Sequence, residues 1–582
     1  MSDITEIGAP VNFDELSKFN DDITNPTLYK EKWLPKVEAF RRARELSIPD
    51  HYKVPTEEVP KDLDEKPFDT IHYLQTTPHI SAEEREITDL SVTQLAEAIA
   101  SGKYTAVQVF EAYAHRTVVL NQFTNHVFEF FLDEGLERAK ELDAYYQTHK
   151  KTVGPLHGVP VSIKEIMRMK GKRHTGAYVS KIDNIPEEDC TTVAILRRLG
   201  AVFYVRTNEP TTMMPDEANN NYIGQTRNPN NSILSTGGSS GGEGASVSSR
   251  ASAIGMGTDI TGSIRAPASY CGCCGLRPTS RRVSAEGAMD GEAGQENLLS
   301  VFGPLASCVT DIDHLMKHYI NLGKPWETDA SCVAMPWRAA GEKYDSAADL
   351  SKIRVGILRD DGTVRPHPPI SRGIQYVEEK LRAAGVDVVE FPQLLIKEAD
   401  DIVCTMQRAD GGHSQKVLLG ESGEPLFPLV RLYLASVCNT APMSITELRA
   451  LVVRRDNLRC AYTKFLNENK IDFIIAPTHA GVAPVGRHDG IAGAYYFQYY
   501  SLFNILDFPS LAMPTGLRQD PKVDVPYTNQ EYRNELDKLE GQKYIPELFV
   551  NAPISFQLAG RRYHDEDVVA FGKIVEKILQ GN

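Results

Sequence analysis

Short apolar segments that alternate with helical segments constrain the fold of this chain more than any other feature. The sequence predicts strands over 159–164, 202–205, 353–358, 386–391 and 473–476, and helices over 192–199, 374–384 and 566–579. Strands that alternate with helices are typical of a mostly parallel sheet with both faces covered. We therefore expect an α/β fold in which helices sandwich one twisted, mixed and mostly parallel β-sheet.

The N-terminal part of the chain is polar and proline-rich, and it contains one clear helical segment over 27–45. Asn25 can cap this helix, and Pro26 suits a first helical turn, where no backbone N–H is needed. Two capping boxes, Ser-x-x-Gln and Thr-x-x-Gln, predict a helical hairpin over 91–119.

The chain of 582 residues has a formal net charge of −15, and this acidity excludes some partners. An acidic surface repels phosphate backbones and anionic lipids, so we expect neither a nucleic-acid nor a membrane partner. No apolar run reaches the ~18–20 residues of a membrane-spanning helix. The acidic N-terminal sequence has no apolar core of a signal peptide, which predicts a cytoplasmic protein.

Nine cysteines are scattered along the chain, and three of them cluster at Cys271, Cys273 and Cys274. No partner CxxC pair and no partner histidine lie at ligand spacing near this cluster, although zinc sites commonly have them. We expect reduced thiols that pack in the core, with no metal and no other cofactor.

The glycine- and serine-rich tract over 235–265 is the most unusual stretch of the sequence. A phosphate-binding loop needs a lysine after its last glycine, and none is present. The tract also matches the G-x-S-x-G elbow of α/β-hydrolases, centred on Ser239 or Ser240, and His488 or His564 could then complete a Ser-His-Asp triad. No apolar strand directly precedes the tract, as such an elbow requires, and a tightly packed structural corner is a further reading.

Long ordered motifs lead to a fourth reading of the tract. They are GPLHGVPVSIKE, TNEPTTMM, GQTRNP, GGSSGGEGAS, GMGTDITGSIRAPAS, CGLRPT, DFIIAPT, YSLFNILDFPSLAMPTG and PISFQLAGRRYHDED. Together they closely resemble the amidase signature family of serine hydrolases, over about residues 88–575. The N-terminal segment EKWLPKVEAFRRARELSIPDHY is similar to the fungal acetamidase branch of that family.

The resemblance implies a division of the chain into two parts. We predict an N-terminal helical arm over 1–87 and a single large amidase signature domain over 88–582. The polar stretch 517–545 reads as a long surface excursion. The arm and this excursion could serve a homodimer.

The resemblance also implies a catalytic relay of three residues. Ser263 would be the nucleophile, Lys164 the terminal base, and Ser239 the group that passes the proton between them. Amide cleavage needs such a nucleophile, a base that later returns the proton to the leaving amine, and a site for the oxyanion.

Further residues of the site follow from the resemblance as well. The backbone N–H groups of Ile260, Thr261, Gly262 and Ser263 would form the oxyanion hole, and the Met213 carbonyl would face the substrate. The peptide between Gly238 and Ser239 would be cis. Asp259 and Arg265 would pair to hold the nucleophile's loop.

A lysine can act as a base only if its pKa is lowered, because a free lysine titrates near ~10.4. Burial can lower that pKa by as much as 3–5 units. The apolar residues Val159, Val161, Ile163 and Ile166 flank Lys164 and predict a dry site.

One residue departs from the usual family pattern, in which DIGGS precedes the nucleophile. This chain has Thr261 in place of the first of those two glycines. A β-branched residue restricts the backbone and adds bulk. We expect a narrowed acyl site that favours small acyl groups, or carbamate esters, over long fatty amides.

The sequence therefore predicts a serine hydrolase that cleaves C–N bonds of small amides, with esters or carbamates such as alkyl urethanes as further substrates and water as the second reactant. Two alternatives stay open. One is a subunit of a tRNA-dependent amidotransferase, and the other is an α/β-hydrolase-type esterase with a Ser-His-Asp triad.

Overall fold

An 11-stranded sheet runs through the computed structural model, which describes residues 23–289, 291, 293–344, 349–438, 441–486, 496–528 and 531–581. Its strands are β1 (Val127–Phe130), β2 (Pro160–Lys164), β3 (Val202–Thr207), β6 (Ile254–Asp259), β7 (Cys274–Arg277), β8 (Val301–Ala306), β9 (Arg354–Ile357), β10 (Asp387–Glu390), β11 (Phe473–Pro477), β12 (Ser510–Arg518) and β13 (Pro553–Ala559). A separate small hairpin pairs β4 (Asn219–Asn220) with β5 (Gly224–Gln225).

The strands lie side by side in the order β1-β3-β2-β6-β8-β7-β12-β13-β11-β9-β10. Parallel pairing is confined to two groups, β3-β2-β6 and β11-β9-β10. The six other pairings of this sheet, within the described residues, are antiparallel. The prediction of a mixed sheet within an α/β fold is confirmed, but the mostly parallel pairing holds only within those two groups, because an apolar run by itself does not reveal the direction of its neighbour.

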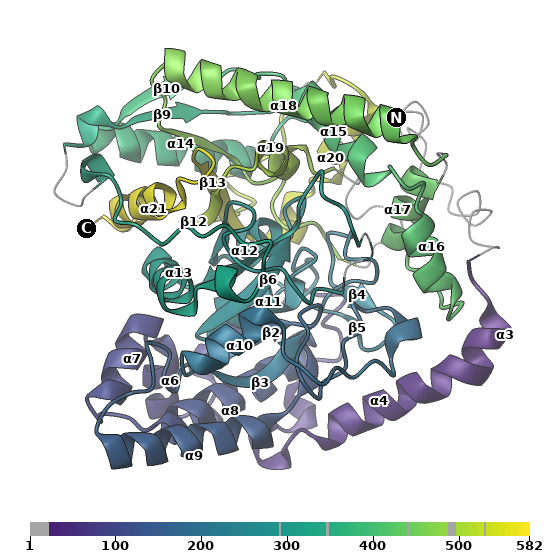
Figure 1. Cartoon of the computed structure of the whole chain (residues 1–582), viewed down its shortest axis with the longest axis vertical. Helices are drawn as coiled ribbons and strands as arrows, with labels where there is room; N and C mark the ends of the chain where they lie inside the picture. The colour runs from purple at the N-terminus through teal and green to yellow at the C-terminus, as the bar shows by residue number, and fades with distance from the viewer. Residues whose placement is uncertain are drawn as a thin grey trace.

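Helices surround the sheet, as Figure 1 shows. They are α3 (Pro26–Leu28), α4 (Leu34–Leu46), α5 (Thr70–Thr76), α6 (Ala82–Asp89), α7 (Val92–Ala100), α8 (Ala106–Thr124), α9 (Leu132–His149), α10 (Thr191–Arg198), α11 (Gly241–Ser248), α12 (Arg265–Cys271), α13 (Val309–Gly323), α14 (Pro368–Ala383), α15 (Ile396–Gln407), α16 (His413–Gly420), α17 (Pro428–Cys438), α18 (Ile445–Glu468), α19 (Gln498–Leu506), α20 (Glu535–Lys543) and α21 (Asp565–Gln580). None of these described helices combines the length and apolar character that crossing a bilayer requires.

Both faces of the sheet are covered. Two adjacent residues of β12 pack into different core clusters, one on each face. Successive side chains of a strand point to opposite faces. Leu511 packs into the largest core cluster, which includes residues of α8, α10, α13, α14 and α21. Its neighbour Ala512 packs in a smaller cluster with Val247 of α11 and Ala268 of α12. Helices α11 and α12 are therefore buried against the sheet, on the face opposite the main core.

The N-terminal helical segment begins as predicted. The Asn25 side chain accepts a hydrogen bond from the N–H of Leu28 at 3.0 Å, and the helix continues through a π-helical segment (Tyr29–Trp33) into α4. Both predicted capping boxes are present at the starts of α7 and α8. These helices form where expected because short-range side-chain to backbone bonds determine where they start.

The described part of the stretch over 517–545 is mostly exposed, as the prediction of a surface excursion requires, but some of its acidic residues are buried. Its described part contains α20, and Asp524 and Glu540 are buried. Asp524 accepts a bidentate ion pair from Arg372 of α14, with both contacts at 2.7 Å. The polar composition predicts exposure, but Asp524 is buried with a partner that is distant in sequence, and Glu540 is buried beside Lys543.

Candidate active site

Lys164 ends strand β2, which lies in the sheet between β3 and β6. Its side chain is fully buried, and Val161 and Ile163 of the same strand are also buried. The Nζ atom donates one hydrogen bond to Ser239 Oγ and another, of 2.7 Å, to Thr258 Oγ1. The structure thus brings together Lys164 and Ser239, which are far apart in sequence.

Sequence reasoning missed Thr258 as a partner of Lys164. Thr258 lies on β6, the parallel neighbour of β2, and Ile163 is paired with Met256 in that ladder. The sequence feature that could have indicated this role is the position of Thr258 in the motif GMGTDITGS, directly before Asp259. Only the strand pairing, however, reveals that its hydroxyl faces the lysine.

Burial lowers the pKa of Lys164 to about 8, because the low-dielectric interior disfavours the cation. The nearby carboxyl groups of Glu209, Asp259 and Glu243 act in the opposite direction and raise that pKa. The net result makes a substantial neutral fraction available near neutral pH, which is what a proton acceptor requires.

Ser239 follows Gly238, whose backbone lies close to the backbone around Pro215. The Gly238–Ser239 peptide bond is cis, as the resemblance implied. A Cβ atom on Gly238 would lie 2.2 Å from the Pro215 carbonyl oxygen, so no larger residue fits there without displacing backbone. Ser240, the next residue, donates its N–H to the Ser263 carbonyl at 3.2 Å. That bond joins the segment that carries Ser239 to the turn that carries Ser263.

Ser263 lies in the turn between β6 and α12, where Asp259 organises the backbone. The Asp259 carboxylate accepts the N–H groups of Gly262 at 2.8 Å and of Ile264 at 3.2 Å. The prediction that the Gly262 N–H serves the oxyanion is therefore at odds with this geometry, since Asp259 already occupies that donor. No hydrogen bond among the described residues uses the N–H groups of Ile260, Thr261 or Ser263.

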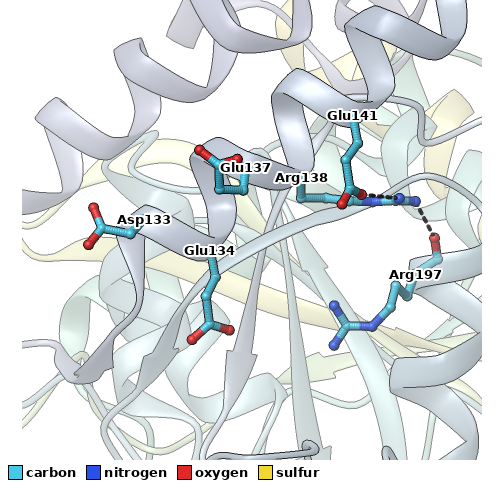
Figure 2. A pocket seen from close by; sticks show the side chains of 6 residues that line it. All are labelled: Asp133, Glu134, Glu137, Arg138, Glu141 and Arg197. Atoms are coloured by element: carbon cyan, nitrogen blue, oxygen red, sulfur yellow. Dashed lines mark hydrogen bonds and ion pairs between the residues drawn. The ribbon is translucent and has the colours of Figure 1, made fainter.

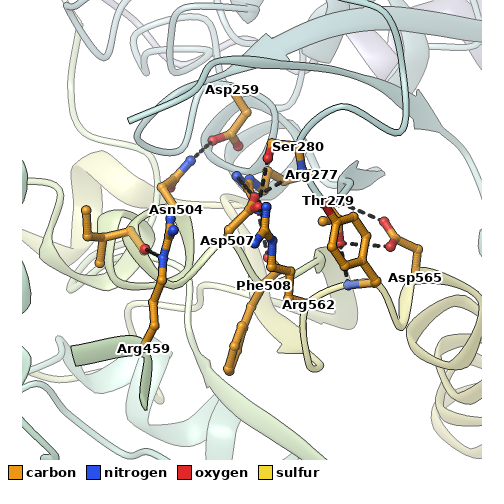
Figure 3. Close-up of polar contacts among 12 residues, drawn as sticks. Asp259, Arg277, Thr279, Ser280, Arg459, Asn504, Asp507, Phe508, Arg562 and Asp565 are labelled. Atoms are coloured by element: carbon orange, nitrogen blue, oxygen red, sulfur yellow. Dashed lines mark hydrogen bonds and ion pairs between the residues drawn. The ribbon is translucent and has the colours of Figure 1, made fainter. Parts of the chain in front are cut away.

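Asp259 and Arg265 pair as expected, and both are fully buried. Arg265 donates to both carboxylate oxygens, at 3.0 and 3.1 Å. Burial by itself would raise the pKa of Asp259, but Arg265, together with Asn504 and Arg277, lowers that pKa to about 2. Asn504 of α19 adds a bond of 2.8 Å to the same carboxylate (Figure 3). The turn is thus fixed by an ionised, fully hydrogen-bonded carboxylate.

A second buried carboxylate, Asp507, lies just after α19 and connects three of the sequence motifs (Figure 3). It accepts hydrogen bonds from Arg277 at 2.8 Å, from the Ser280 hydroxyl at 2.7 Å and from Arg562 at 2.7 Å. Arg277 lies in the motif CGLRPT and Arg562 in AGRRYHDED. These motif residues therefore hold the scaffold together, a role that their sequence did not reveal.

Met213 belongs to a backbone segment of unusual conformation. Thr212 and Met213 have φ angles of 72° and 60°. A non-glycine residue in this region costs of order 1–3 kcal/mol, and such residues cluster at functional sites. Met213 is half-buried and packs against the main core cluster. Its role at the substrate stays a prediction.

The amidase family model matches residues 108–569 of the sequence. The chain belongs to the amidase family. Acetamidases of Aspergillus oryzae and Emericella nidulans are 36% and 35% identical to it, over 93% and 94% of this chain and 98% of each relative. A solved structure of a fatty acid amide hydrolase is 45% identical, with a TM-score of 0.92, and the match covers 98% of this chain and 99% of that one. The predicted resemblance is confirmed, and the chain is an amide-hydrolysing enzyme.

The alternative Ser-His-Asp triad finds no support in this amidase. Within the described residues, no histidine forms a hydrogen bond with Ser239, Ser240 or Ser263. His564 instead pairs with Asp567 at 2.8 Å at the start of α21. His488 lies outside the described residues.

Cys271, Cys273 and Cys274 are buried free thiols, and burial raises the pKa of each. No group of three or more potential metal-ligating side chains occurs among the residues that the structure describes.

A surface hollow lies over α9, apart from the relay residues of the amidase (Figure 2). Its lining is formed by Asp133, Glu134, Glu137, Arg138, Glu141 and Arg197. Arg138 pairs with Glu141 at 3.0 Å and donates to the Arg197 carbonyl at 3.2 Å. None of the predicted site residues lines this hollow.

Proposed function

We propose that this amidase cleaves the C–N bond of small amides through a relay of Lys164, Ser239 and Ser263 and an acyl-enzyme intermediate. The observation that carries the proposal is the buried Lys164 amine bonded to Ser239, in a segment tied to the Ser263 turn. A buried amine with a pKa of about 8 can accept a proton, which an exposed lysine could not do near neutral pH.

The first half-reaction begins when Ser263 Oγ attacks the amide carbonyl carbon. As the new C–O bond forms, the Ser263 proton passes to Ser239 Oγ, and the Ser239 proton passes to Lys164 Nζ. Return of one proton along the same path to the leaving nitrogen lets the C–N bond break, so that the amine departs and Ser263 is acylated.

The second half-reaction uses water in place of Ser263. Water attacks the acyl carbon and gives its proton to the relay, and that proton then restores the Ser263 hydroxyl as the acid leaves. We assign the N–H groups of Ile260, Thr261 and Ser263 to the oxyanion, because these three have no protein acceptor in the described structure. The Gly262 N–H holds the turn through Asp259 instead.

Substitution tests the relay. Lys164→Ala and Ser263→Ala should each lower kcat for acetamide by at least about 10³-fold, as loss of one member of a catalytic unit does elsewhere. His564→Ala is the control and should keep kcat within about twofold. Loss of turnover in His564→Ala with retention in Ser263→Ala would support the esterase triad instead.

The proposal also covers the size of the acyl group that the enzyme prefers. The bulk of Thr261 beside the nucleophile favours small amides or alkyl carbamates, as does the similarity to acetamidases. The similarity to a fatty acid amide hydrolase instead favours fatty amides as substrates. We expect higher kcat/KM for acetamide or ethyl carbamate than for a long-chain fatty amide, and the reverse order would contradict the narrowed site.

Stand-alone hydrolysis distinguishes this function from that of an amidotransferase subunit. The isolated chain should turn over acetamide without any partner. Co-purification with partner subunits and tRNA, together with no activity in the isolated chain, would overturn the proposal.

A further inference from the structure

Asp216 lies in the loop between β3 and β4, directly after Pro215, and has no part in the relay described above. One of its carboxylate oxygens accepts the N–H of Gly238 at 2.9 Å. The other accepts the Tyr270 hydroxyl, also at 2.9 Å. Both oxygens are therefore engaged, each by a different segment of the chain.

The first of these segments carries Ser239. Gly238 is the residue before Ser239, and its N–H bond fixes the Gly237–Gly238 peptide unit, one residue before this serine. The backbone of Asp216 adds a second tie, because its carbonyl accepts the Ser235 hydroxyl at 3.0 Å and Ser235 Oγ in turn accepts the Gly237 N–H at 2.9 Å. One residue thus holds the backbone at both positions before Ser239.

The second segment carries Ser263. Tyr270 lies in α12, which begins two residues after Ser263. Tyr270 is fully buried, so the surrounding side chains confine its ring. Hydrogen bonds to an ionised acceptor are roughly twice as strong as neutral ones, and a carboxylate can bond two donors at once. Asp216 therefore connects the two serine-bearing segments through a single side chain.

We propose that Asp216 is a positioning residue that sets the place of Ser239 relative to Lys164 and Ser263. The inference rests on the proposed relay. A shift of about 1 Å in a reacting group can cost ~10²-fold in rate, so loss of this contact should appear in the chemical step rather than in substrate binding.

The test compares Asp216→Ala with Asp216→Asn. The alanine variant has no acceptor for Gly238, and we expect kcat to fall by about 10–100-fold with KM within about threefold. The asparagine Oδ1 can still accept the Gly238 N–H while its amide donates to the Tyr270 oxygen, so Asp216→Asn should retain kcat within about threefold of the parent. Rates are normalised to the folded fraction measured by circular dichroism.

A matched control separates positioning from general loss of stability. Asp143 also accepts backbone N–H groups, from Ala106 at 2.7 Å and Val107 at 3.1 Å, but at the start of α8. Asp143→Ala should lower the urea midpoint and leave kcat unchanged. A fall in kcat as large as that of Asp216→Ala would contradict the inference.

The outcomes distinguish this inference from the relay itself. If Ser263→Ala is inactive and Asp216→Ala keeps kcat within threefold, the positioning role is wrong and the relay stands. If Ser263→Ala retains turnover, the relay itself is wrong. Equal losses in Asp216→Asn and Asp216→Ala would also contradict positioning by hydrogen-bond acceptance. Should Asp216→Ala not fold, Asp216→Ser replaces it under the same criterion, and failure of both to fold would mean a purely structural role.

Discussion

At the scale of single residues, the pKa of Lys164 decides what the site can do. The lysine is buried, and its two hydrogen bonds go to the hydroxyls of Ser239 and Thr258 rather than to carboxylates. A carboxylate partner would stabilise the cation, whereas hydroxyl groups can accept from either form of the amine and leave burial as the dominant influence. The choice of neutral partners thus keeps the amine available as a base.

This lowered pKa predicts a pH dependence of the rate. Only the neutral amine accepts a proton, so kcat/KM should rise about tenfold per pH unit below the Lys164 pKa and level off above pH 8, where the amine is mostly neutral. The measurement is kcat/KM for acetamide from pH 5.5 to 9.5. A flat profile between pH 6 and 9 would contradict a lysine base with this pKa.

At the scale of elements, the turn from β6 into α12 is the most constrained part of the site. Asp259 closes this turn by accepting two backbone N–H groups, and its ion pair with Arg265 balances the negative charge of the carboxylate. Gly262 has a φ of 124°, and a Cβ on it would lie 2.6 Å from the Tyr500 ring. Conformation and space therefore both require glycine here, one residue before Ser263.

Gly262→Ala should consequently damage both stability and rate. We expect the free energy of unfolding to fall by about 2–4 kcal/mol, from backbone strain and from the clash with Tyr500, and kcat to fall at least about tenfold. Urea denaturation and acetamide turnover are the measurements.

Gly102→Ala is the matched control for that substitution. Gly102 also has a positive φ, of 76°, but nothing lies within 4 Å of the site of its Cβ. It should lose only about 1–2 kcal/mol and keep its kcat. Equal effects of the two substitutions would mean that the Tyr500 contact is unimportant.

At the scale of the whole molecule, the N-terminal helical arm packs along the body of the enzyme. Trp33, Val37 and Phe40 are buried in one cluster with Phe128 and Tyr222. In Figure 1, α3 and α4 run along the lower right of the molecule toward α9. This packing makes the arm part of the folded unit rather than a loose extension.

Replacing a buried side chain of α4 by alanine tests how much the arm contributes to the stability of the fold. The Phe40 ring centroid lies 5.1 Å from that of Phe128 and 5.3 Å from that of Tyr222. Phe40→Ala should lower the free energy of unfolding by about 3–5 kcal/mol, since it leaves a cavity among these rings. Leu46, in the same helix, is 87% exposed, and Leu46→Ala should change stability by no more than about 0.5 kcal/mol. Similar urea midpoints for the two variants would mean that the arm is not part of the cooperative unit.

Local sequence patterns established the family and the starts of α3, α7 and α8, and the resemblance implied the order of the relay residues. Capping boxes and ordered motifs are local signals, and they are readable because each depends on neighbours a few residues away. Apolar runs likewise predicted β2, β3, β9, β10 and β11 close to their observed bounds. The strands that the sequence did not indicate include β6, which is glycine-rich and has no regular alternation, and β7, whose sequence CGLR contains a glycine and an arginine.

The assembly of the site depends on tertiary contacts that the local sequence does not specify. The antiparallel pairing at the centre of the sheet, the Thr258 contact to Lys164 and the Asp216 contact to Gly238 all join segments that are distant in sequence or on different strands. Strand pairing depends on side-chain packing against neighbours that the local sequence does not specify. For the same reason the glycine- and serine-rich tract was ambiguous as a sequence, and became a defined site only where β2, β6 and α12 meet.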